Sequence, residues 1–335
     1  MKAVLWTAYG AAATSLAITH TARKPQPQQL SRTSVLVRVH AAGIAQGDCE
    51  MRAMNLPAFI RAPVRLMTGL VKPRTGSVLG QEFSGVVEHV GPAVDAFKIG
   101  DQVYGTTGVA FGAYAEFVAV DAAGAGGSLL AIKPSNLTHA QASVAALSAM
   151  EALCFLRQAR MKEGDSVLVI GAGGNIGSFA VQLAKRYFKA GKVVGVDSTN
   201  KLDMMRELGA DHVADFTKED YVASTQDKFD VILDAPGKCA FSSCERIMNE
   251  GGRYAKAMFG FGEFLGKMLP STGTKEMVLG MATYQKEDFE LLTRLFEEGA
   301  IAPVIDRCFK MDDVVKAHEY SESGQKVGCI AMTIP

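Results

Sequence analysis

The chain has 335 residues, enough for two domains of ordinary size, and 48% of them are hydrophobic, which is ample for buried cores. Lys and Arg together number 35, as do Asp and Glu, so the balanced charge argues against a nucleic acid or a membrane surface as partner. The six cysteines form no C-x-x-C pair and the six histidines no H-E-x-x-H pattern, which favours reduced thiols in a cytoplasmic protein without a structural zinc site.

The first 130 residues read mostly as β structure. A strand at 2–6 and a second at 15–19 fit the N-terminus better than a signal peptide, because Tyr9 and Gly10 interrupt the apolar run. Further short strands, separated by glycines, are typical of a partly open barrel. We place these strands at residues 34–40, 82–90, 102–104 and 114–120.

Residues 51–74 are too long for a hairpin loop and mix apolar with basic side chains. Three interpretations stay open for this segment. It forms an amphipathic helix that caps the barrel, a lid over an apolar substrate, or a contact with a membrane surface or a partner.

From about residue 138 the pattern changes, because helical stretches alternate with short buried strands. Such alternation predicts a parallel sheet covered on both faces, and the strand-like tail after residue 303 predicts a return to the first domain. We therefore expect an α/β protein whose second domain, 134–300, is inserted between 1–133 and 301–335. The expected strands are 167–170, 193–196, 231–233, 253–257 and 329–334, and the expected helices are 139–157, 175–188, 201–208 and 285–298.

Residues 164–185 carry the clearest functional signal. An apolar run at 167–170 meets a cluster of glycines and passes into a helical pattern. This strand, turn and helix would present backbone N–H groups to a pyrophosphate. Asp197 ends the next strand about 20 residues later, where a ribose-binding carboxylate is expected. The predicted dinucleotide contacts in the turn are Gly173, Gly174, Asn175, Ile176 and Gly177.

Segments along nearly the whole chain resemble the medium-chain dehydrogenase/reductase superfamily, and within it the zinc-independent quinone oxidoreductase branch. The matching segments are residues 1–10, 35–43, 79–91, 164–185 and 302–307, with Asn175 standing where this branch usually has glycine. The resemblance implies a GroES-like β-barrel domain and an inserted Rossmann domain with a doubly wound parallel sheet.

The resemblance also implies which groups are missing. Ala45, Gln81 and Val144 stand where the zinc-dependent relatives have metal ligands, and Gly47 replaces the hydroxyl that relays the alcohol proton. These side chains cannot hold zinc as Cys and His do, so no zinc is expected. Hydride transfer to an already electrophilic carbon remains, in a quinone or an α,β-unsaturated carbonyl whose oxyanion needs a hydrogen-bond donor.

Three catalytic candidates follow from this resemblance. Gln81 could face the substrate, Arg52 could bind an anionic group or the developing oxyanion, and Asp48 matches an acidic residue that lies behind the metal in relatives. Glu82 matches a second such residue. Glu50 replaces a tyrosine that related quinone reductases use, which disfavours tyrosine-assisted catalysis here.

The cofactor is NADPH or NADH, with a slight preference for NADPH because the branch mostly uses it. Asp197 would accept the ribose hydroxyls of NADH, whereas Ser198, Thr199 and Lys201 look like the 2′-phosphate pocket of NADPH-using relatives. Ser148 matches a small hydroxyl residue beside the nicotinamide ring. The remaining expected cofactor contacts are Gln46, Pro236 and Phe259.

Other functions stay open. The chain could be a non-catalytic NADPH-binding protein with a regulatory, structural or RNA-binding role, although its neutral charge disfavours RNA, or a metal-independent aldehyde reductase. As an enzyme it would take a small apolar electrophile and no nucleic acid. By analogy we expect a homodimer through an edge strand at 276–283, and no run is long enough to span a membrane.

Overall fold

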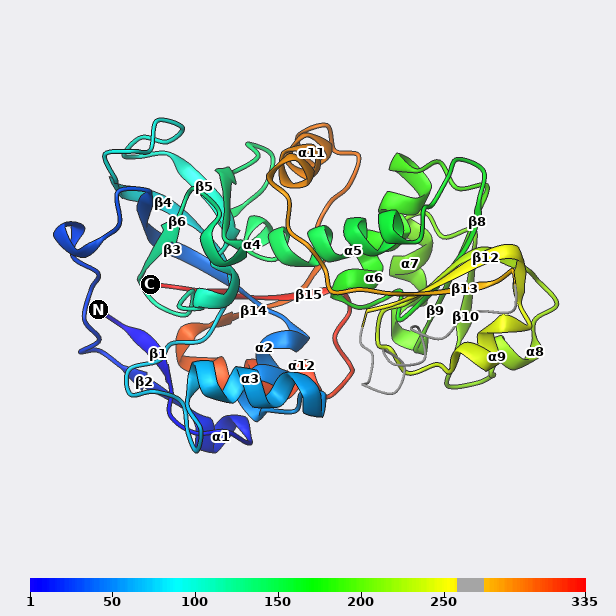
Figure 1. Cartoon of the computed structure of the whole chain (residues 1–335), viewed down its shortest axis with the longest axis horizontal. Coiled ribbons are helices and arrows are strands. Elements are labelled where there is room, and N and C mark those ends of the chain that lie inside the picture. Colours follow the sequence, from blue (N-terminus) through cyan, green and yellow to red (C-terminus); the bar gives the residue numbers. More distant parts are fainter. Residues whose placement is uncertain (258–273) are drawn as a thin grey trace. The chain divides into compact units, whose positions relative to one another are not determined.

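The computed structural model describes residues 1–257 and 274–335 (Figure 1). These residues form two compact units. Unit 1 comprises Met1–Leu147, Tyr284–Glu297 and Pro303–Pro335, and unit 2 comprises Ser148–Thr283 and Glu298–Ala302.

A seven-stranded sheet organises unit 1. Its central strand β3 (Ser34–Ile44) pairs antiparallel with three neighbours, one of which, β15 (Cys329–Thr333), comes from the C-terminal tail. In Figure 1 the red β15 lies beside the blue β3. The other strands are β4 (Glu82–Val90), β5 (Gln102–Thr106), β6 (Phe117–Asp121), β7 (Leu129–Ile132) and β14 (Ile305–Lys310).

Alternating side chains of these strands build the core of unit 1. Val37, Phe83 and Met332 are fully buried and belong to one hydrophobic cluster. A separate hairpin of β1 (Ala3–Trp6) and β2 (Leu16–Thr19) adds Val4 and Trp6 to the same cluster. Ser15, where the second strand was predicted to begin, is instead the last residue of the short helix α1 (Ala12–Ser15).

Several helices surround the sheet of unit 1. The segment 51–74 contains α3 (Ala58–Thr68), so its amphipathic pattern does form a helix. The predicted helix 139–157 is divided into α4 (His139–Ala142) and α5 (Ala146–Gln158). Thr138 accepts the N–H of Gln141 and caps the start of α4. The helices are α2 (Gln46–Ala53), α3, α4 (His139–Ala142), α11 (Lys286–Glu297) and α12 (Val314–Glu322).

Unit 2 holds a six-stranded, fully parallel sheet of order β10-β9-β8-β11-β12-β13. The strand order reverses between β8 and β11. In doubly wound sheets a ligand binds outside the carboxyl ends of the strands at this reversal. The strands are β8 (Ser166–Ile170), β9 (Lys192–Asp197), β10 (His212–Asp215), β11 (Phe229–Asp234), β12 (Met248–Lys256) and β13 (Glu276–Leu279).

The helices of unit 2 connect these strands. The predicted helix 175–188 is α6 (Asn175–Gln182) followed by one π-helical turn (Leu183–Tyr187). Among the described residues, no helix combines the length and hydropathy needed to cross a bilayer. The other helices are α5 (Ala146–Gln158), which starts in unit 1, α7 (Leu202–Glu207), α8 (Tyr221–Ser224) and α9 (Phe241–Glu245).

Short 3-10 turns complete the secondary structure. They are η1 (Pro27–Gln29), η2 (Gly108–Ala110), η3 (Ala125–Gly127), η5 (Thr199–Lys201) and η6 (Met311–Asp313).

Candidate functional site

The turn after β8 lies where the strand order of unit 2 reverses. Gly171 adopts a left-handed backbone with φ 75°, and a Cβ built there would lie 2.6 Å from Cδ of Pro236, in the loop after β11. Glycine alone allows both the turn and this close contact. The structure therefore brings two sequence-predicted segments together at the reversal.

Two further glycines of the turn have distinct steric roles. A Cβ on Gly177 would lie 2.1 Å from the carbonyl oxygen of Gly171, so this glycine lets α6 pack closely against the turn. A Cβ on Gly173 would lie 2.5 Å from Cδ of Lys201. Tight turn, close helix packing and close approach at the backbone are the roles that glycines have in a dinucleotide-binding turn.

The N-terminus of α6 follows this turn directly. Gly174 precedes the helix, and Asn175 is its first residue. Asn175 does not have a positive φ, so asparagine replaces glycine here without a left-handed backbone. The first N–H groups of a helix have no intrahelical acceptor and carry partial positive charge, which suits a pyrophosphate.

Asp197, at the end of β9, is bound from two sides. Its Oδ2 accepts the N–H of Gly173 at 2.9 Å, and its Oδ1 accepts the N–H of Ser198 at 2.8 Å. Nζ of Lys201 lies 2.8 Å from the same Oδ1, and the side chains of Asp197 and Lys201 are only 5% and 9% exposed. The carboxylate predicted to contact the ribose is therefore already neutralised by a buried lysine.

The hydroxyls beside this pair contact other partners. Thr199 Oγ1 donates to Asp215, and together with Thr217 it holds the pKa of the Asp215 carboxyl well below its ordinary value. Ser198 Oγ lies 2.9 Å from Oδ1 of Asn200. It also donates to Oδ1 of Asp197 at 3.4 Å, so Lys201 is the residue of the predicted phosphate pocket that pairs with Asp197 by charge.

Asp234, at the end of β11, was not among the predicted site residues. It is fully buried and accepts the N–H groups of Gly237 at 2.9 Å and Cys239 at 2.7 Å, and the hydroxyl of Tyr254 at 2.8 Å. These bonds fix the loop that carries Pro236. The sequence Asp-Ala-Pro-Gly after a buried strand is a turn signal that could have identified it.

Two further residues, Ser148 and Phe259, were predicted to contact the cofactor. Ser148 lies in α5 and is 2% exposed. Phe259 lies outside the described residues.

In unit 1, Asp48 lies in the first turn of α2, two residues after Gln46 begins the helix. Its Oδ2 accepts the N–H of Ala45 at 2.9 Å. Burial raises the pKa of Asp48 to about 6, and the Ala45 N–H, the Tyr114 hydroxyl and the Lys326 charge oppose this rise only in part. The carboxyl is therefore partly protonated near neutral pH.

Arg52, at the end of α2, is 1% exposed and its guanidinium forms an ion pair with Glu322 of α12. Nearby, Cys49 Sγ lies 3.3 Å from Nδ1 of His318. Burial, and then the charge of Arg52, lowers the pKa of His318 to about 3, so this imidazole is neutral. The surroundings of Arg52 favour a role in joining α2 to α12. Since about 270 positions separate these partners, no local pattern could have revealed them.

Gln81 immediately precedes β4 and is half-buried. Its Nε2 donates to the carbonyl of Gly108 at 2.8 Å, which holds the amide in place and leaves a second N–H on the same nitrogen. The neighbouring Glu82 is buried and accepts the N–H of Leu147. Of the three catalytic candidates, Gln81 has the most accessible side chain.

Ala45, Gln81 and Val144 are the residues that the resemblance places at or near the metal-ligand positions of zinc-dependent relatives. Throughout residues 1–257 and 274–335, no three side chains of His, Cys, Asp or Glu are grouped to hold a metal ion. The residue types present do not fit a catalytic zinc ion.

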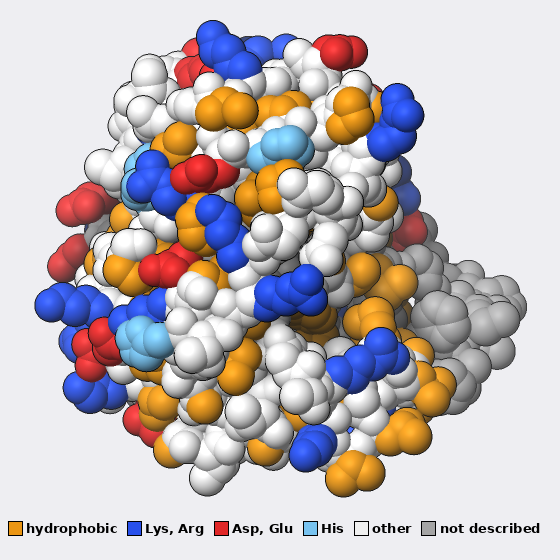
Figure 2. Space-filling view, turned by 90° about the vertical axis from the view of Figure 1, so that its left-hand side faces the viewer, with side chains coloured by type: hydrophobic (Ala, Val, Ile, Leu, Met, Phe, Trp, Pro, Cys, Tyr) orange, Lys and Arg blue, Asp and Glu red, His pale blue; other side chains and the backbone are white. Residues whose placement is uncertain are grey.

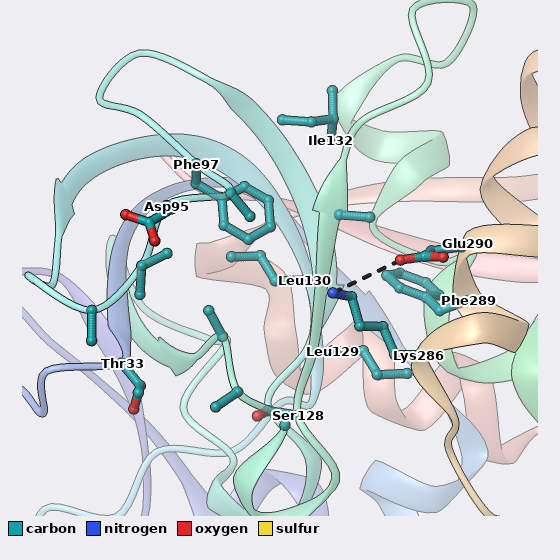
Figure 3. Close-up of a pocket in the computed structure, with 17 residues that line it drawn as sticks. Thr33, Asp95, Phe97, Ser128, Leu129, Leu130, Ile132, Lys286, Phe289 and Glu290 are labelled. Carbon is teal, nitrogen blue, oxygen red and sulfur yellow. Dashed lines mark ion pairs between the residues drawn. The ribbon is translucent and has the colours of Figure 1, made fainter.

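A cavity of about 380 Å³ lies elsewhere in unit 1, between β7 and α11 (Figure 3). Leu129, Leu130 and Phe289 line it, and the ion pair of Lys286 with Glu290, 3.8 Å long, lies at its edge. None of the predicted site residues lines this cavity. It is therefore separate from the candidate site.

Two family models match the chain. One is described as an alcohol dehydrogenase GroES-like domain and covers residues 31–127, and the other, described as a zinc-binding dehydrogenase, covers residues 208–331. They match parts of both units.

Similar proteins match over most of their length. The chain is 32% identical over 341 residues to the 2-methylene-furan-3-one reductase of Solanum lycopersicum, covering 99% of this chain and 79% of that protein. It is 31% identical to the chloroplastic NADPH-dependent alkenal/one oxidoreductase of Arabidopsis thaliana, covering 91% and 73%. The solved quinone oxidoreductase of Coxiella burnetii has a TM-score of 0.83 at 25% identity and covers 100% and 99%. The similarity thus extends well beyond the glycine turn.

Proposed function

Because the chain belongs to the medium-chain dehydrogenase/reductase superfamily, in its quinone oxidoreductase-like branch, we propose that it is an NAD(P)H-dependent reductase of quinones or α,β-unsaturated carbonyls. The relatives named above are a furanone reductase, an alkenal/one oxidoreductase and a quinone oxidoreductase. Their shared chemistry is reduction of an electron-poor, conjugated acceptor.

The observation that carries this proposal is the glycine turn at the strand reversal of unit 2. Gly171 contacts Pro236 there, Gly173 leaves room beside Lys201, and the N-terminus of α6 faces the same turn. These residues fit a dinucleotide, with the pyrophosphate on the helix N-terminus and the ribose near Asp197. Bound there, a reduced nicotinamide supplies a hydride.

The acceptor follows from the side chains at the metal-ligand positions. Ala45, Gln81 and Val144 cannot polarise an alcohol or a carbonyl through zinc, so the acceptor carbon must already be electrophilic. We assign the second N–H of Gln81 to the developing oxyanion, since its first is held by Gly108. Asp48 and Arg52 are buried, and we propose that they position α2 and its first residue, Gln46.

We further propose a modest preference for NADPH. A lone carboxylate at the end of β9 would repel a 2′-phosphate, but Lys201 neutralises Asp197 here. The pair therefore removes the main electrostatic objection to NADPH.

The quaternary structure and compartment belong to the same proposal. β13 is the last strand in the order of the described sheet of unit 2, and by analogy with the family we propose a homodimer through this edge. We propose that the domains divide near residues 133 and 300, and that the enzyme works in the cytoplasm, where its cysteines stay reduced.

The test is oxidation of NADPH and of NADH, each with a quinone and with an α,β-unsaturated ketone, in buffer containing a metal chelator. Turnover with either acceptor supports a zinc-independent reductase, and the ratio of kcat/KM values measures the cofactor preference. Tight NADPH binding without turnover on either acceptor would favour a non-catalytic binding protein. Failure to bind both cofactors would contradict the assignment of the glycine turn.

A further inference from the structure

The strongest unexplained surface of the described residues lies on α3 and the turn that follows it. Leu66, Leu70 and Val71 are 68%, 63% and 87% exposed, and Met67 is 43% exposed. Four of the nine exposed large hydrophobic side chains in the described ranges thus fall within six consecutive positions. Soluble proteins seldom gather exposed apolar side chains in this way without a binding role.

The opposite side of this segment is fixed to unit 1. Leu56 and Val64 pack against its hydrophobic core. The Tyr9 hydroxyl donates to the carbonyl of Gly69 at 2.5 Å and lies 2.9 Å from Oγ1 of Thr68. The exposed side chains are therefore displayed on an anchored helix end.

Basic side chains lie among these apolar ones, and we call the whole set the α3 patch. Arg61, Arg65 and Arg74 donate to backbone carbonyls of their own segment. None of the patch cations forms an ion pair within residues 1–257 and 274–335. The α3 patch consists of Leu66, Met67, Leu70, Val71, Arg61, Arg65, Lys72 and Arg74.

The charge of this patch is uncompensated. No Asp or Glu occurs between Glu50 and Glu82, although the chain as a whole has 35 acidic and 35 basic residues. In the lower right of Figure 2, hydrophobic side chains lie next to Lys and Arg with no acidic side chain between them. The chemistry that complements this patch is anionic with an apolar interior.

We propose that the α3 patch docks on an anionic lipid surface. The exposed aliphatic side chains enter the interface and the four cations contact headgroup phosphates, as in interfacial helices that combine an apolar face with Lys and Arg. This peripheral contact adds to the proposed reductase function and does not depend on it. It would place the enzyme at the surface where lipophilic acceptors accumulate.

Charge also argues against the other occupants of this surface. A symmetric contact with a second copy would bring the same four cations of each protomer together without one carboxylate. A nucleic acid would meet the charges but would gain nothing from the aliphatic side chains, which offer no stacking surface. Only a partner that is both anionic and apolar complements the cations of the α3 patch and its aliphatic side chains.

The test is co-sedimentation of the full chain with vesicles of phosphatidylcholine, alone or mixed with phosphatidylglycerol. We expect binding to the mixed vesicles that weakens as salt is added, and little binding to phosphatidylcholine alone. Leu70→Ser/Val71→Ser and Lys72→Glu/Arg74→Glu should each weaken binding by roughly tenfold or more. The matched control is Lys98→Glu/Ile99→Ser, which changes another exposed Lys next to a 68% exposed Ile and should bind like the unchanged chain.

Thermal unfolding of each variant, followed by circular dichroism, verifies that it is folded. Absence of binding to the mixed vesicles, or the same loss in the control variant, would overturn the proposal. So would a dimer that dissociates in the patch variants, which would make a second copy the occupant. A higher KM for the enone with unchanged vesicle binding would overturn it in favour of a substrate lid.

Discussion

At the scale of single residues, we propose that Lys201 controls how unit 2 binds the 2′-phosphate of NADPH. Its ammonium pairs with Asp197 inside the protein. Removing it leaves a buried carboxylate that would face the 2′-phosphate of NADPH, whereas the ribose hydroxyls of NADH can donate to that carboxylate. We therefore expect Lys201→Ala to weaken NADPH binding by roughly 10- to 100-fold, the size of a lost charge-assisted hydrogen bond, and NADH binding much less.

Fluorescence titration of both cofactors measures this difference. Lys192→Ala is the matched control, because Lys192 begins β9, the strand that Asp197 ends, and also forms an ion pair, with Asp227 at 2.6 Å. Equal losses for NADPH and NADH in Lys201→Ala would show that Lys201 does not discriminate between them.

Asp48 gives a second residue-scale prediction, on stability against pH. Its folded pKa of about 6 exceeds its ordinary value of 3.8, so between these pH values the folded state binds more protons than the unfolded state. The contribution of Asp48 to the free energy of unfolding therefore falls by up to about 3 kcal/mol as pH rises from about 4 to 6. Above pH 6 this contribution is constant. Asp48→Asn keeps an acceptor for the Ala45 N–H and removes this penalty.

We expect Asp48→Asn to be more stable than the unchanged chain at pH 7.5 and to lose this advantage near pH 4.5, as measured by urea unfolding. Because His318 is kept neutral by burial, it adds a pH dependence of opposite sign in the same range. That term is common to both proteins and cancels in their difference. A difference that does not change with pH would show that Asp48 titrates normally.

At the scale of elements, the close packing of α6 on the turn after β8 depends on one missing side chain. Gly177→Ala would place Cβ 2.1 Å from the carbonyl oxygen of Gly171, which is backbone and cannot move aside easily. We expect a loss of about 1–3 kcal/mol, as for overpacking in a core, and weaker NADPH binding.

Gly174→Ala is the control for this substitution. Its Cβ would lie 3.4 Å from the same oxygen, an ordinary contact, and its φ of −91° suits any residue. Thermal unfolding should separate the two variants by several degrees. If both unfold at the same temperature, helix packing does not require glycine at position 177.

Element positions were largely predictable because they follow from local patterns. The strands β8, β9, β11 and β12 overlap their predicted places, since buried apolar runs between turns have few alternatives, whereas β10 was not predicted. The end of α6 was not predictable. The buried Gln182 amide exchanges two hydrogen bonds with the backbone of Ala302, 120 positions away, and a π-helical turn follows. No helical periodicity carries information about such a contact.

At the scale of the whole molecule, the sequence predicts the features that depend on neighbouring residues better than the contacts between distant segments. The glycine turn and Asp197 were found from the sequence because strand, turn and helix are contiguous there. The pairing of β15 with β3 was predictable only as a return of the tail, without its register. The surroundings of Arg52 were not predictable, because α12 contributes them from the far end of the chain.

This long-range contact gives a prediction about how the tail holds unit 1 together. Arg52 is almost fully buried, whereas the side chain of Glu322 is 37% exposed, so loss of Glu322 leaves a buried guanidinium without its anion. We expect Glu322→Gln to destabilise the protein by roughly 2–4 kcal/mol, less than a fully buried pair would allow, because solvent reaches the Glu322 side of the contact.

A second substitution separates charge from packing in this contact. Arg52→Met removes the stranded cation while keeping an apolar stem of similar length, so Arg52→Met/Glu322→Gln should be more stable than Glu322→Gln alone. Urea unfolding of both single variants and the double variant completes the cycle. Additive losses would mean that the two side chains are not coupled, and α12 would then be held to α2 by its apolar contacts instead. A coupling of 1 kcal/mol or more, on the order found for charges in direct contact, would establish that the last helix fixes the position of α2 and hence of Gln46.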